Sequence, residues 1–407
     1  MLLGVVTLGL RGTRRRKLLV PLHLPKEITV KRKKVALLTA AVALASSAVL
    51  VGSASGFAST SPGDREGDQG SQDDGGSGYE VGLFGDMPYG DYGRAKYPNV
   101  IADMNRANLA FSVFDGDSKN GSEPCYADPH PHALNEPTPE KAVADATHPD
   151  IYKYALNLFG QFRDPVVFLP GDNDWTDCDR PATKDGAVSD SNDRLAYERA
   201  LYFPTDRSLG QRTIAQIRQS AAYPENVRWS RGPVTFIGLN IPGSDNNYAD
   251  GGKNGPAAEG QAEYAARNAA NLEWLRAGFV AAKASHSKGI MIVIQADMWD
   301  PTATVTHFAD TKAELARQSI AFDGKVVLVN GDSHSFEIDK PLTDAATTNA
   351  AGLAGPNVIE NFTRVTTFGD VQNHWVSAII DAKDPNVFSF HQHLVTANLP
   401  TYTPPAP

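Results

Sequence analysis

Residues 326–342, VVLVNGDSHSFEIDKPL, place a short apolar run directly before a glycine, an aspartate and a histidine. The apolar run is typical of a buried strand, and Gly331 is expected to allow a tight turn where that strand ends. Asp332 and His334 follow two residues apart, just beyond the strand. A carboxylate and an imidazole in this place are candidate functional groups.

Four more apolar runs of the chain stop at a polar tip. They are YEVGLFGDMPYG (79–90), NLAFSVFDGDSKNG (108–121), DPVVFLPGDNDWTDC (164–178) and GIMIVIQADMWD (289–300). Helical patterns lie between the strands, at 257–284 and 306–324. Strands that alternate with helices predict an α/β fold with much parallel sheet, in which ligands bind beyond the carboxyl ends of the strands. The five tips are therefore expected to converge, although any single Gly-Asp pair also fits an ordinary turn or a helix N-cap.

The charge distribution favours a cation as the ligand of such a site. The chain has 407 residues, of which 41% are hydrophobic and 21% charged, with a net charge of −9, as in a soluble globular protein. Residues 1–58 contain ten Lys and Arg but a single acid, so the remainder is more acidic than the whole. An acidic body argues against a nucleic-acid partner. Converging carboxylates repel one another unless a cation lies among them, which predicts a metal site.

Residues 1–58 have the features of an export signal behind a basic segment. KRKK at 31–34 precedes the uncharged run VALLTAAVALASSAVLV at 35–51 and the small residues GSASGFAS at 52–59. A basic region, an apolar region and a small-residue cleavage zone make up a secretory signal peptide. We therefore expect a secreted protein, and contact with a membrane only if this segment stays uncleaved as an anchor.

The rest of the chain divides into three parts. They are a flexible Gly-, Ser- and Asp-rich linker at 59–78, a folded domain at 79–395 and a Pro-rich tail at 396–407. The chain has two cysteines, Cys125 and Cys178. In an oxidising compartment they are expected to form a disulfide, and two separate buried thiols are the alternative.

The order and spacing of the motifs resemble the calcineurin-like metallophosphoesterase family over residues 79–394. That family's motifs are Asp-X-His, Gly-Asp, Gly-Asn-His-Asp/Glu, a His that ends a strand, and Gly-His-X-His. The matching stretches here are Asp86-Met87-Pro88, Gly116-Asp117, Gly171-Asp172-Asn173-Asp174, Gln295, and Gly331-Asp332-Ser333-His334. The resemblance implies a four-layer αββα sandwich of two mixed β-sheets flanked by helices. Strands expected within 358–395 would complete the second sheet.

The resemblance also implies one or two divalent metal ions. One seat would use Asp86, Asp117 and His334, with Pro88 where the family has a further histidine. The other seat would use Asp117, Asp172, Gln295 and Asp332, each of which offers an oxygen. Oxygen ligands suit Mn²⁺ or Mg²⁺, and also Ca²⁺, better than the ions that imidazoles favour. The implied reaction is hydrolysis of a phosphorylated small molecule or a phosphodiester by a metal-bound hydroxide.

Asn173 stands where the family has a catalytic histidine. An amide hydrogen-bonds a phosphate but cannot protonate a leaving group, and loss of a general acid commonly slows a reaction by about 10²–10⁴. The candidate catalytic residues are therefore Asn173 and its neighbour Asp174, with the loop histidines His130 and His132 as further proton donors. In such a fold the disulfide would brace the ligand loops. Candidate substrate-binding residues beside the motifs are Tyr89, Lys119 and Trp175.

Two other interpretations compete with this one. Asp115 and Asp117 also resemble the Asp-X-Asp of haloacid-dehalogenase phosphatases, where the first aspartate is the nucleophile and the second the acid or base. The histidines missing at positions 88, 173 and 295 equally fit a degenerate phosphoesterase fold that binds its ligand without turning it over.

Overall fold

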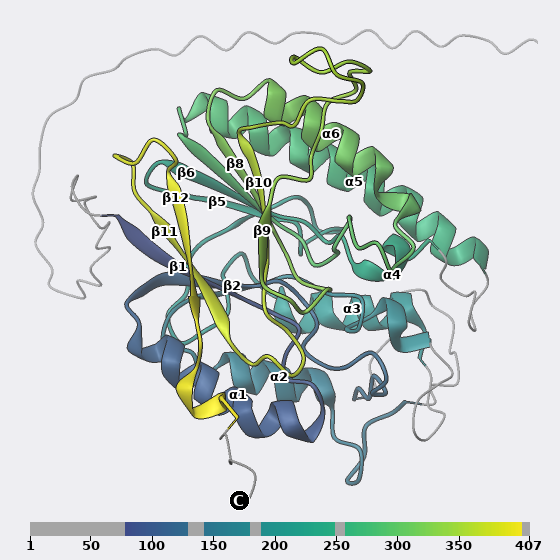
Figure 1. The fold of residues 1–407 in the computed structure, drawn as a ribbon. Helices are drawn as coiled ribbons and strands as arrows, with labels where there is room; N and C mark the ends of the chain where they lie inside the picture. The colour runs from purple at the N-terminus through teal and green to yellow at the C-terminus, as the bar shows by residue number, and fades with distance from the viewer. Residues whose placement is uncertain (1–77, 129–141, 180–188, 249–256, 401–407) are drawn as a thin grey trace, which may run out of the picture. The chain divides into compact units, whose positions relative to one another are not determined.

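The computed structural model describes residues 78–128, 142–179, 189–248 and 257–400, which belong to one compact unit of the chain. The predicted signal segment lies outside these residues, as do His130 and His132. Two β-sheets form the centre of the described part, and helices lie on their outer faces (Figure 1).

The first sheet has five strands in the order β12-β11-β1-β2-β3. Their bounds are β1 Tyr79–Phe84, β2 Leu109–Phe114, β3 Val166–Phe168, β11 Trp375–Ile380 and β12 Phe388–His393. Strands β1, β2 and β3 are parallel, whereas β11 pairs antiparallel with both β1 and β12. The sheet is therefore mixed, and the carboxyl ends of β1 to β3 meet at one edge.

The second sheet has seven strands in the order β4-β5-β6-β7-β8-β10-β9. Their bounds are β4 Ile217–Arg218, β5 Val227–Arg231, β6 Val234–Gly238, β7 Gly289–Val293, β8 Lys325–Asn330, β9 Glu337–Asp339 and β10 Phe362–Thr366. Strands β6, β7, β8 and β10 are parallel, and the three outer strands are antiparallel to their neighbours. This sheet is mixed as well.

Strand β8, which contains the apolar run of residues 326–329, shows how the layers pack. Val327 and Val329 face the first sheet and belong to the core between the two sheets. Val326 and Leu328 face the other way and belong to the core under the helices. Alternate residues of a strand point to opposite faces, so a strand buried on both faces must be apolar at every position.

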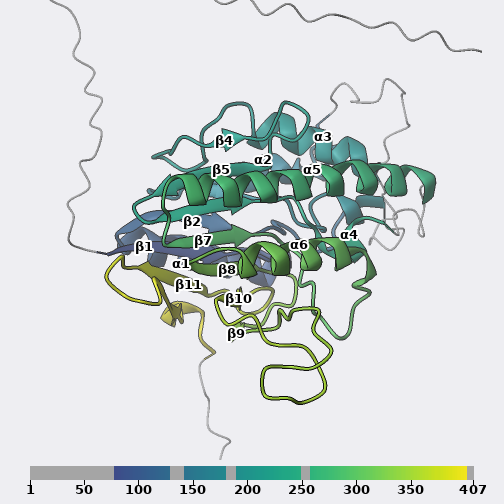
Figure 2. The same ribbon diagram turned by 90° about the horizontal axis from the view of Figure 1, so that it is seen from above.

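Helices form the two outer layers. Their bounds are α1 Gly90–Arg106, α2 Ile151–Phe159, α3 Ser191–Tyr202, α4 Gly243–Asn246, α5 Ala257–Ala284 and α6 Ala309–Ile320. Helices α5 and α6 cover the seven-stranded sheet (Figure 2), and α1 and α2 pack on the outer face of the five-stranded sheet. The predicted αββα sandwich with two mixed sheets is therefore confirmed. Among the described helices, none has the length and hydrophobicity needed to cross a membrane.

The end of the chain is arranged differently from the expectation. Of the last three strands, only β10 joins the second sheet, while β11 and β12 extend the first, because β11 pairs with β1 and buries Val376, Ala378 and Ile380 between the sheets. The packed part also continues past residue 395. Asn398 is buried and donates hydrogen bonds to Lys96 O and Asn373 O.

Candidate functional site

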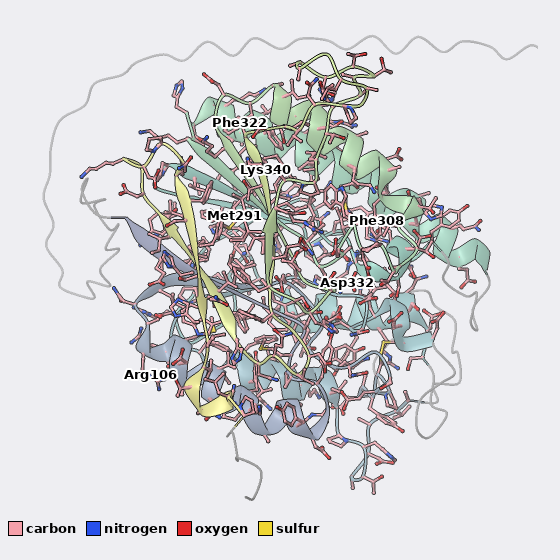
Figure 3. All side chains as sticks on the ribbon, viewed as in Figure 1. Arg106, Met291, Phe308, Phe322, Asp332 and Lys340 are labelled. Atoms are coloured by element: carbon pink, nitrogen blue, oxygen red, sulfur yellow. A yellow bond between two sulfur atoms is a disulfide. The ribbon has the colours of Figure 1, made fainter. Side chains whose placement is uncertain are left out.

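The six predicted ligand residues meet beyond the carboxyl ends of both sets of parallel strands. They are Asp86 after β1, Asp117 after β2, Asp172 after β3, Gln295 after β7, and Asp332 and His334 after β8. Direct contacts join them: Asp332 N donates to Asp86 Oδ2 at 3.0 Å, and Gln295 Nε2 donates to Asp172 Oδ1 at 3.1 Å. We refer to these six residues as the carboxylate cluster. Asp332 is labelled in Figure 3, and Gly243 at the start of α4 lies next to its carboxylate.

The backbone of the carboxylate cluster is strained. The residues with left-handed conformation are Asp86, Asp117, Asp332 and His334, whose φ angles are 49°, 66°, 71° and 62°. This conformation costs about 1–2 kcal/mol for an L-residue, somewhat less for Asp. Strain of this kind persists where the surrounding structure imposes it, and it concentrates at functional sites. Four strained residues in one contact network therefore mark a functional site.

The glycines of the Gly-Asp motifs provide space for carboxylates from other strands. A Cβ on Gly171 would lie 2.0 Å from Asp117 Oδ1, and a Cβ on Gly331 would lie 2.3 Å from Asp86 Oδ2. Gly331 does not have a positive φ. Glycine is therefore required at position 331 because Asp86 approaches closely, and not because of the expected tight turn.

The carboxylate cluster is rich in negative charge. Burial and the charges of Asp172 and Asp86 hold the pKa of Asp117 and of Asp332 well above the usual range. Burial lowers the pKa of His334, but its hydrogen bond to Asp86 and the nearby charges outweigh this, so the pKa is raised. Within the described residues, no Lys or Arg bonds to a carboxylate of the cluster. Repulsion among these groups is relieved only by protons, neutral donors or a cation.

Neutral donors surround Asp117. Tyr89 Oη donates to Asp117 Oδ2 at 2.8 Å, and Asn173 donates to the same carboxylate from its backbone N at 2.9 Å and from Nδ2 at 2.6 Å. Gln295 Nε2 adds a longer bond of 3.3 Å to Oδ2. Asn173 and Tyr89 therefore hold Asp117, and neither side chain is directed at an open space.

Asp174 braces the loops that carry the ligands. Its carboxylate is fully buried and accepts hydrogen bonds from Gly171 N, Asp117 N and both N and Oγ of Ser118. Burial raises the pKa of Asp174, although these donors oppose the rise. A carboxylate closed in by four donors is placed to hold two loops together, and not to protonate a leaving group as the sequence had suggested.

All three predicted substrate-binding residues, Tyr89, Lys119 and Trp175, are buried. Trp175 has no exposed surface, and the guanidinium of Arg267 lies over its ring. Lys119 is 1% exposed and donates to Asn120 O and Glu123 O. Both side chains are enclosed by the protein in this structure, so neither is exposed to a substrate.

Asp115, the nucleophile of the competing interpretation, is also inaccessible. It is fully buried, accepts a hydrogen bond from Thr367 Oγ1 at 2.9 Å, and has its pKa raised by burial and by Asp86. An attacking nucleophile must meet its substrate, which Asp115 does not in this position.

The structure adds a turn that the sequence did not reveal as part of the site. Residues 244–247, which include most of α4, all have φ between 49° and 62°, so this segment is a short left-handed turn after β6 and not a regular right-handed helix. Ser244 Oγ donates to Asp172 Oδ2 at 2.7 Å and to Asp177 Oδ1 at 2.8 Å. Asp245 fastens the turn to His307 by accepting from its backbone N at 3.0 Å. The run GSDNN, with several residues that tolerate a positive φ, was the available signal.

Cys125 and Cys178 form the predicted disulfide. Cys125 belongs to the loop after Asp117, and Cys178 to the loop after Asp172. Tyr152 Oη, which donates to Asp174 O at 2.7 Å, lies beside Cys178. The disulfide therefore ties together the two loops that supply Asp117 and Asp172.

The carboxylates of the cluster offer oxygen ligands of the kind that suit a hard cation. Asp172 Oδ2 and both oxygens of Asp332 lie within 2.8 Å of the point where a Cβ of Gly243 would be, so no side chain separates these carboxylates. Asp332 Oδ1 accepts no protein hydrogen bond among the described residues, and carboxylate oxygens are the ligands that Mg²⁺, Mn²⁺ and Ca²⁺ prefer. No group of three or more His, Cys, Asp or Glu in the described part stands in metal-holding geometry, so these side chains would have to close on an ion.

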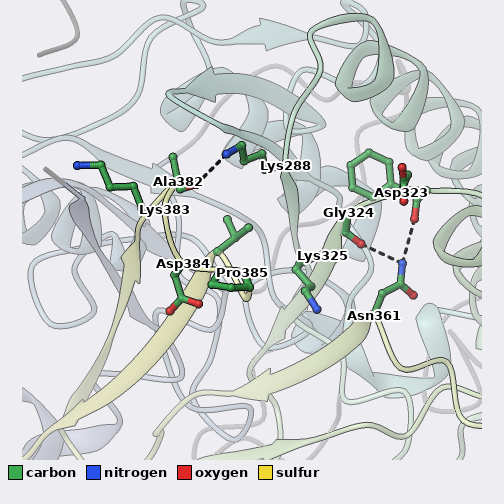
Figure 4. Close-up of a pocket in the computed structure, with 11 residues that line it drawn as sticks. Lys288, Asp323, Gly324, Lys325, Asn361, Ala382, Lys383, Asp384 and Pro385 are labelled. Atoms are coloured by element: carbon green, nitrogen blue, oxygen red, sulfur yellow. Dashed lines mark hydrogen bonds between the residues drawn. The ribbon is translucent and has the colours of Figure 1, made fainter. Parts of the chain in front are cut away.

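A separate cavity of about 550 Å³ lies at the opposite edge of the seven-stranded sheet (Figure 4). Lys288 and Lys325, at the start of β7 and β8, line it, and Lys288 Nζ donates to Ala382 O at 2.8 Å. None of the six residues of the carboxylate cluster reaches this cavity. It is therefore distinct from the candidate site.

Comparison with known proteins gives two structural likenesses. The crystal structure of a dimetal phosphatase from Danio rerio is 12% identical with a TM-score of 0.44, covering 79% of this chain and 98% of that one. GAP50, the anchor in the inner membrane complex of Plasmodium, is 11% identical with a TM-score of 0.38, covering 81% of this chain and 98% of that one. No protein-family model and no curated protein matches the sequence. At these levels neither likeness bears on activity.

Proposed function

We propose that this protein is a phosphate-ester hydrolase that works with a divalent cation bound by the carboxylate cluster. The observation that supports the proposal is the convergence of Asp86, Asp172, Asp332 and His334 from the ends of β1, β3 and β8. The backbone is left-handed at Asp86, Asp332 and His334, and no Lys or Arg is bonded to the four side chains in the described residues. Such an arrangement costs free energy and is maintained only if it serves a ligand.

The residues divide the work in the following way. Asp86, Asp172 and Asp332 would hold the cation, most suitably Mg²⁺ or Mn²⁺, which when bound attracts a phosphate group and activates water. His334 is partly exposed and held by Asp86 at 3.5 Å, so its imidazole is placed to donate a hydrogen bond to a phosphate oxygen. Asn173 and Asp174 are both occupied by hydrogen bonds within the protein, so neither is free to protonate a leaving group. Esters whose leaving group departs without a proton are the expected substrates.

The test is an assay of the purified full chain, stripped of metal, with p-nitrophenyl phosphate and bis-p-nitrophenyl phosphate in Mg²⁺, Mn²⁺ and Ca²⁺. Turnover is expected only with cation and is expected to fall on the order of 100-fold in Asp332→Asn. Asp323→Asn, an exposed carboxylate at the opposite edge, is the matched control and should keep wild-type activity. Equal turnover with and without cation contradicts the proposal.

A second candidate is a protein that binds a phosphate ester and a cation without hydrolysis. The engagement of Asn173 by Asp117 through both its backbone and its side chain favours it, because no proton donor replaces the missing histidine there. Calorimetric binding of a non-hydrolysed phosphate ester, together with no turnover for either nitrophenyl ester, selects this alternative.

Export is a further part of the proposal. The basic and apolar segments before residue 59 have the order of a signal peptide, and a disulfide such as Cys125–Cys178 is stable in an oxidising compartment. Recovery of the mature chain outside the cytoplasm after expression, with its N-terminus between residues 52 and 60, tests this point.

A further inference from the structure

We propose that the side-chain amide of Gln295 takes the place of a second cation, so that the carboxylate cluster binds one divalent ion and not two. That one ion binds at all rests on the proposed function. That a second ion is excluded rests on the hydrogen bonds of Gln295. The second seat implied by the sequence required the Gln295 oxygen to face Asp117 and Asp172.

The hydrogen bonds of Gln295 fix the orientation of its amide. Gly243 N donates to Gln295 Oε1 at 2.5 Å, and Asp172 N donates to the same atom at 3.3 Å. A backbone N–H only donates, so the atom that it meets must be the oxygen. The NH₂ group therefore points the other way, toward Asp172 Oδ1 at 3.1 Å and Asp117 Oδ2 at 3.3 Å. Two carboxylates share the hydrogens of one buried amide.

This orientation leaves no ligand for an ion between Asp117 and Asp172. A cation needs lone pairs directed at it, and the Gln295 NH₂ group offers hydrogens in that direction. Asp117 cannot compensate, because Tyr89 and Asn173 already donate three hydrogen bonds to it. Gln295 is fully buried, and rotation of its amide would leave the Gly243 N–H facing another donor.

The other side of the carboxylate cluster keeps room for one ion. Asp332 is only partly buried, and its Oδ1 accepts no hydrogen bond from the described residues, while its Oδ2 accepts one from Asp297 N at 3.1 Å. The Cβ position of Gly243 is the point that Asp332 shares with Asp172 Oδ2. The single ion is therefore expected between Asp172 and Asp332, close to Gly243.

The test counts ions in a variant of the same shape. Gln295→Glu keeps the acceptor for Gly243 N but turns the two N–H donors into a carboxylate oxygen that faces Asp117 and Asp172. Full chain saturated with Mn²⁺ and desalted should contain one ion per chain, and the variant should contain two by elemental analysis. Gln216→Glu adds the same charge at a buried glutamine outside the cluster and should leave the count unchanged.

A second variant covers the case in which Gln295→Glu does not fold. Gln295→His supplies an imidazole nitrogen, so it too should gain one ion, with Zn²⁺ now competing against Mn²⁺. A gain of one ion in either variant over a wild-type count of one or none supports the proposal. Two ions in the wild-type chain, or folded variants with the wild-type count, overturn it. A wild-type chain that binds no ion defeats the proposed function separately, because the difference between variant and wild type still decides the role of Gln295.

Discussion

The carboxylate cluster has two sides, one at Asp117 and one at Asp332, and the two carboxylates differ in how many hydrogen bonds they accept from the protein. Asp117 is enclosed by donors from Tyr89, Asn173 and Gln295, so its charge is spread over hydrogen bonds inside the protein. Asp332 has one backbone donor and partial access to solvent. Carboxylates of the same motif type therefore do different work: the enclosed one holds the loops, and the open one remains available to a cation. A ligand role follows from unused lone pairs and not from the residue type alone.

The largest effect is expected from Asp117→Asn. The new amide would turn a donor toward Tyr89, Asn173 or Gln295, which are donors themselves, and bonds to a charged acceptor would be lost. We expect the free energy of unfolding to fall by about 2–3 kcal/mol, measured by urea denaturation without cation. Asp332→Asn is the matched control and should lower stability much less, since the Asp332 carboxylate accepts only one hydrogen bond from the described residues. Equal losses of unfolding free energy in both variants would contradict the proposed difference between Asp117 and Asp332.

Filling the open side without removing a ligand is the next test. A Cβ in Gly243→Ala would lie 2.7–2.8 Å from oxygens of both Asp172 and Asp332, in the space assigned to the ion. We expect Mn²⁺ affinity to fall on the order of 10–100-fold by calorimetry, comparable to loss of a group that supports metal ligands. Gly160→Ala, where a Cβ has ordinary contacts, should bind as wild type. If Gly243→Ala binds Mn²⁺ with unchanged affinity, the ion does not bind next to Gly243.

Glu198 in α3 extends the comparison to a buried carboxylate with no donor at all among the described residues. Burial, together with Asp174 and Glu225, raises its pKa well above the usual range. The unfolded chain loses this proton near the ordinary glutamate pKa and the folded chain only at higher pH, so stability falls as pH rises between the two. Glutamine does not titrate, so Glu198→Gln avoids this pH-dependent fall in stability. The variant should be more stable than wild type by about 1 kcal/mol at pH 8.

Chemical denaturation at pH 5 and pH 8 measures that difference. The advantage of Glu198→Gln should be larger at pH 8 than at pH 5. An advantage that is the same at both values would show that Glu198 does not titrate in this interval.

The smallest effect is expected from Tyr89→Phe. The change removes one of the donors to Asp117 and leaves those of Asn173 and Gln295 in place. Stability should fall by about 1 kcal/mol, the usual net contribution of a hydrogen bond. Mn²⁺ affinity should remain within error of wild type by calorimetry, because the enclosed side does not bind the ion. A large drop in affinity would instead assign Tyr89 to the cation site.

Much of the fold was predictable because burial imposes simple patterns on a strand. The run VVLV at 326–329 is apolar at every position since β8 packs on both faces, and helix 257–284 was visible from its pattern. The placement of β11 beside β1 was not predictable. The pattern of apolar residues along a strand indicates that the strand is buried. It does not indicate which neighbouring strand it pairs with.

The sequence by itself determined the α/β class and the convergence of polar tips, because strand polarity brings carboxyl ends to one edge. The resemblance of its motifs to a known family implied which six residues would meet there. Only the tertiary structure decided what each residue does there. Lys119 and Trp175 turned inward, Ser244 entered from a left-handed turn, and Gln295 directed its hydrogens at the carboxylates. Hydrogen-bond direction and burial depend on neighbours far apart in the chain, and no local pattern encodes them.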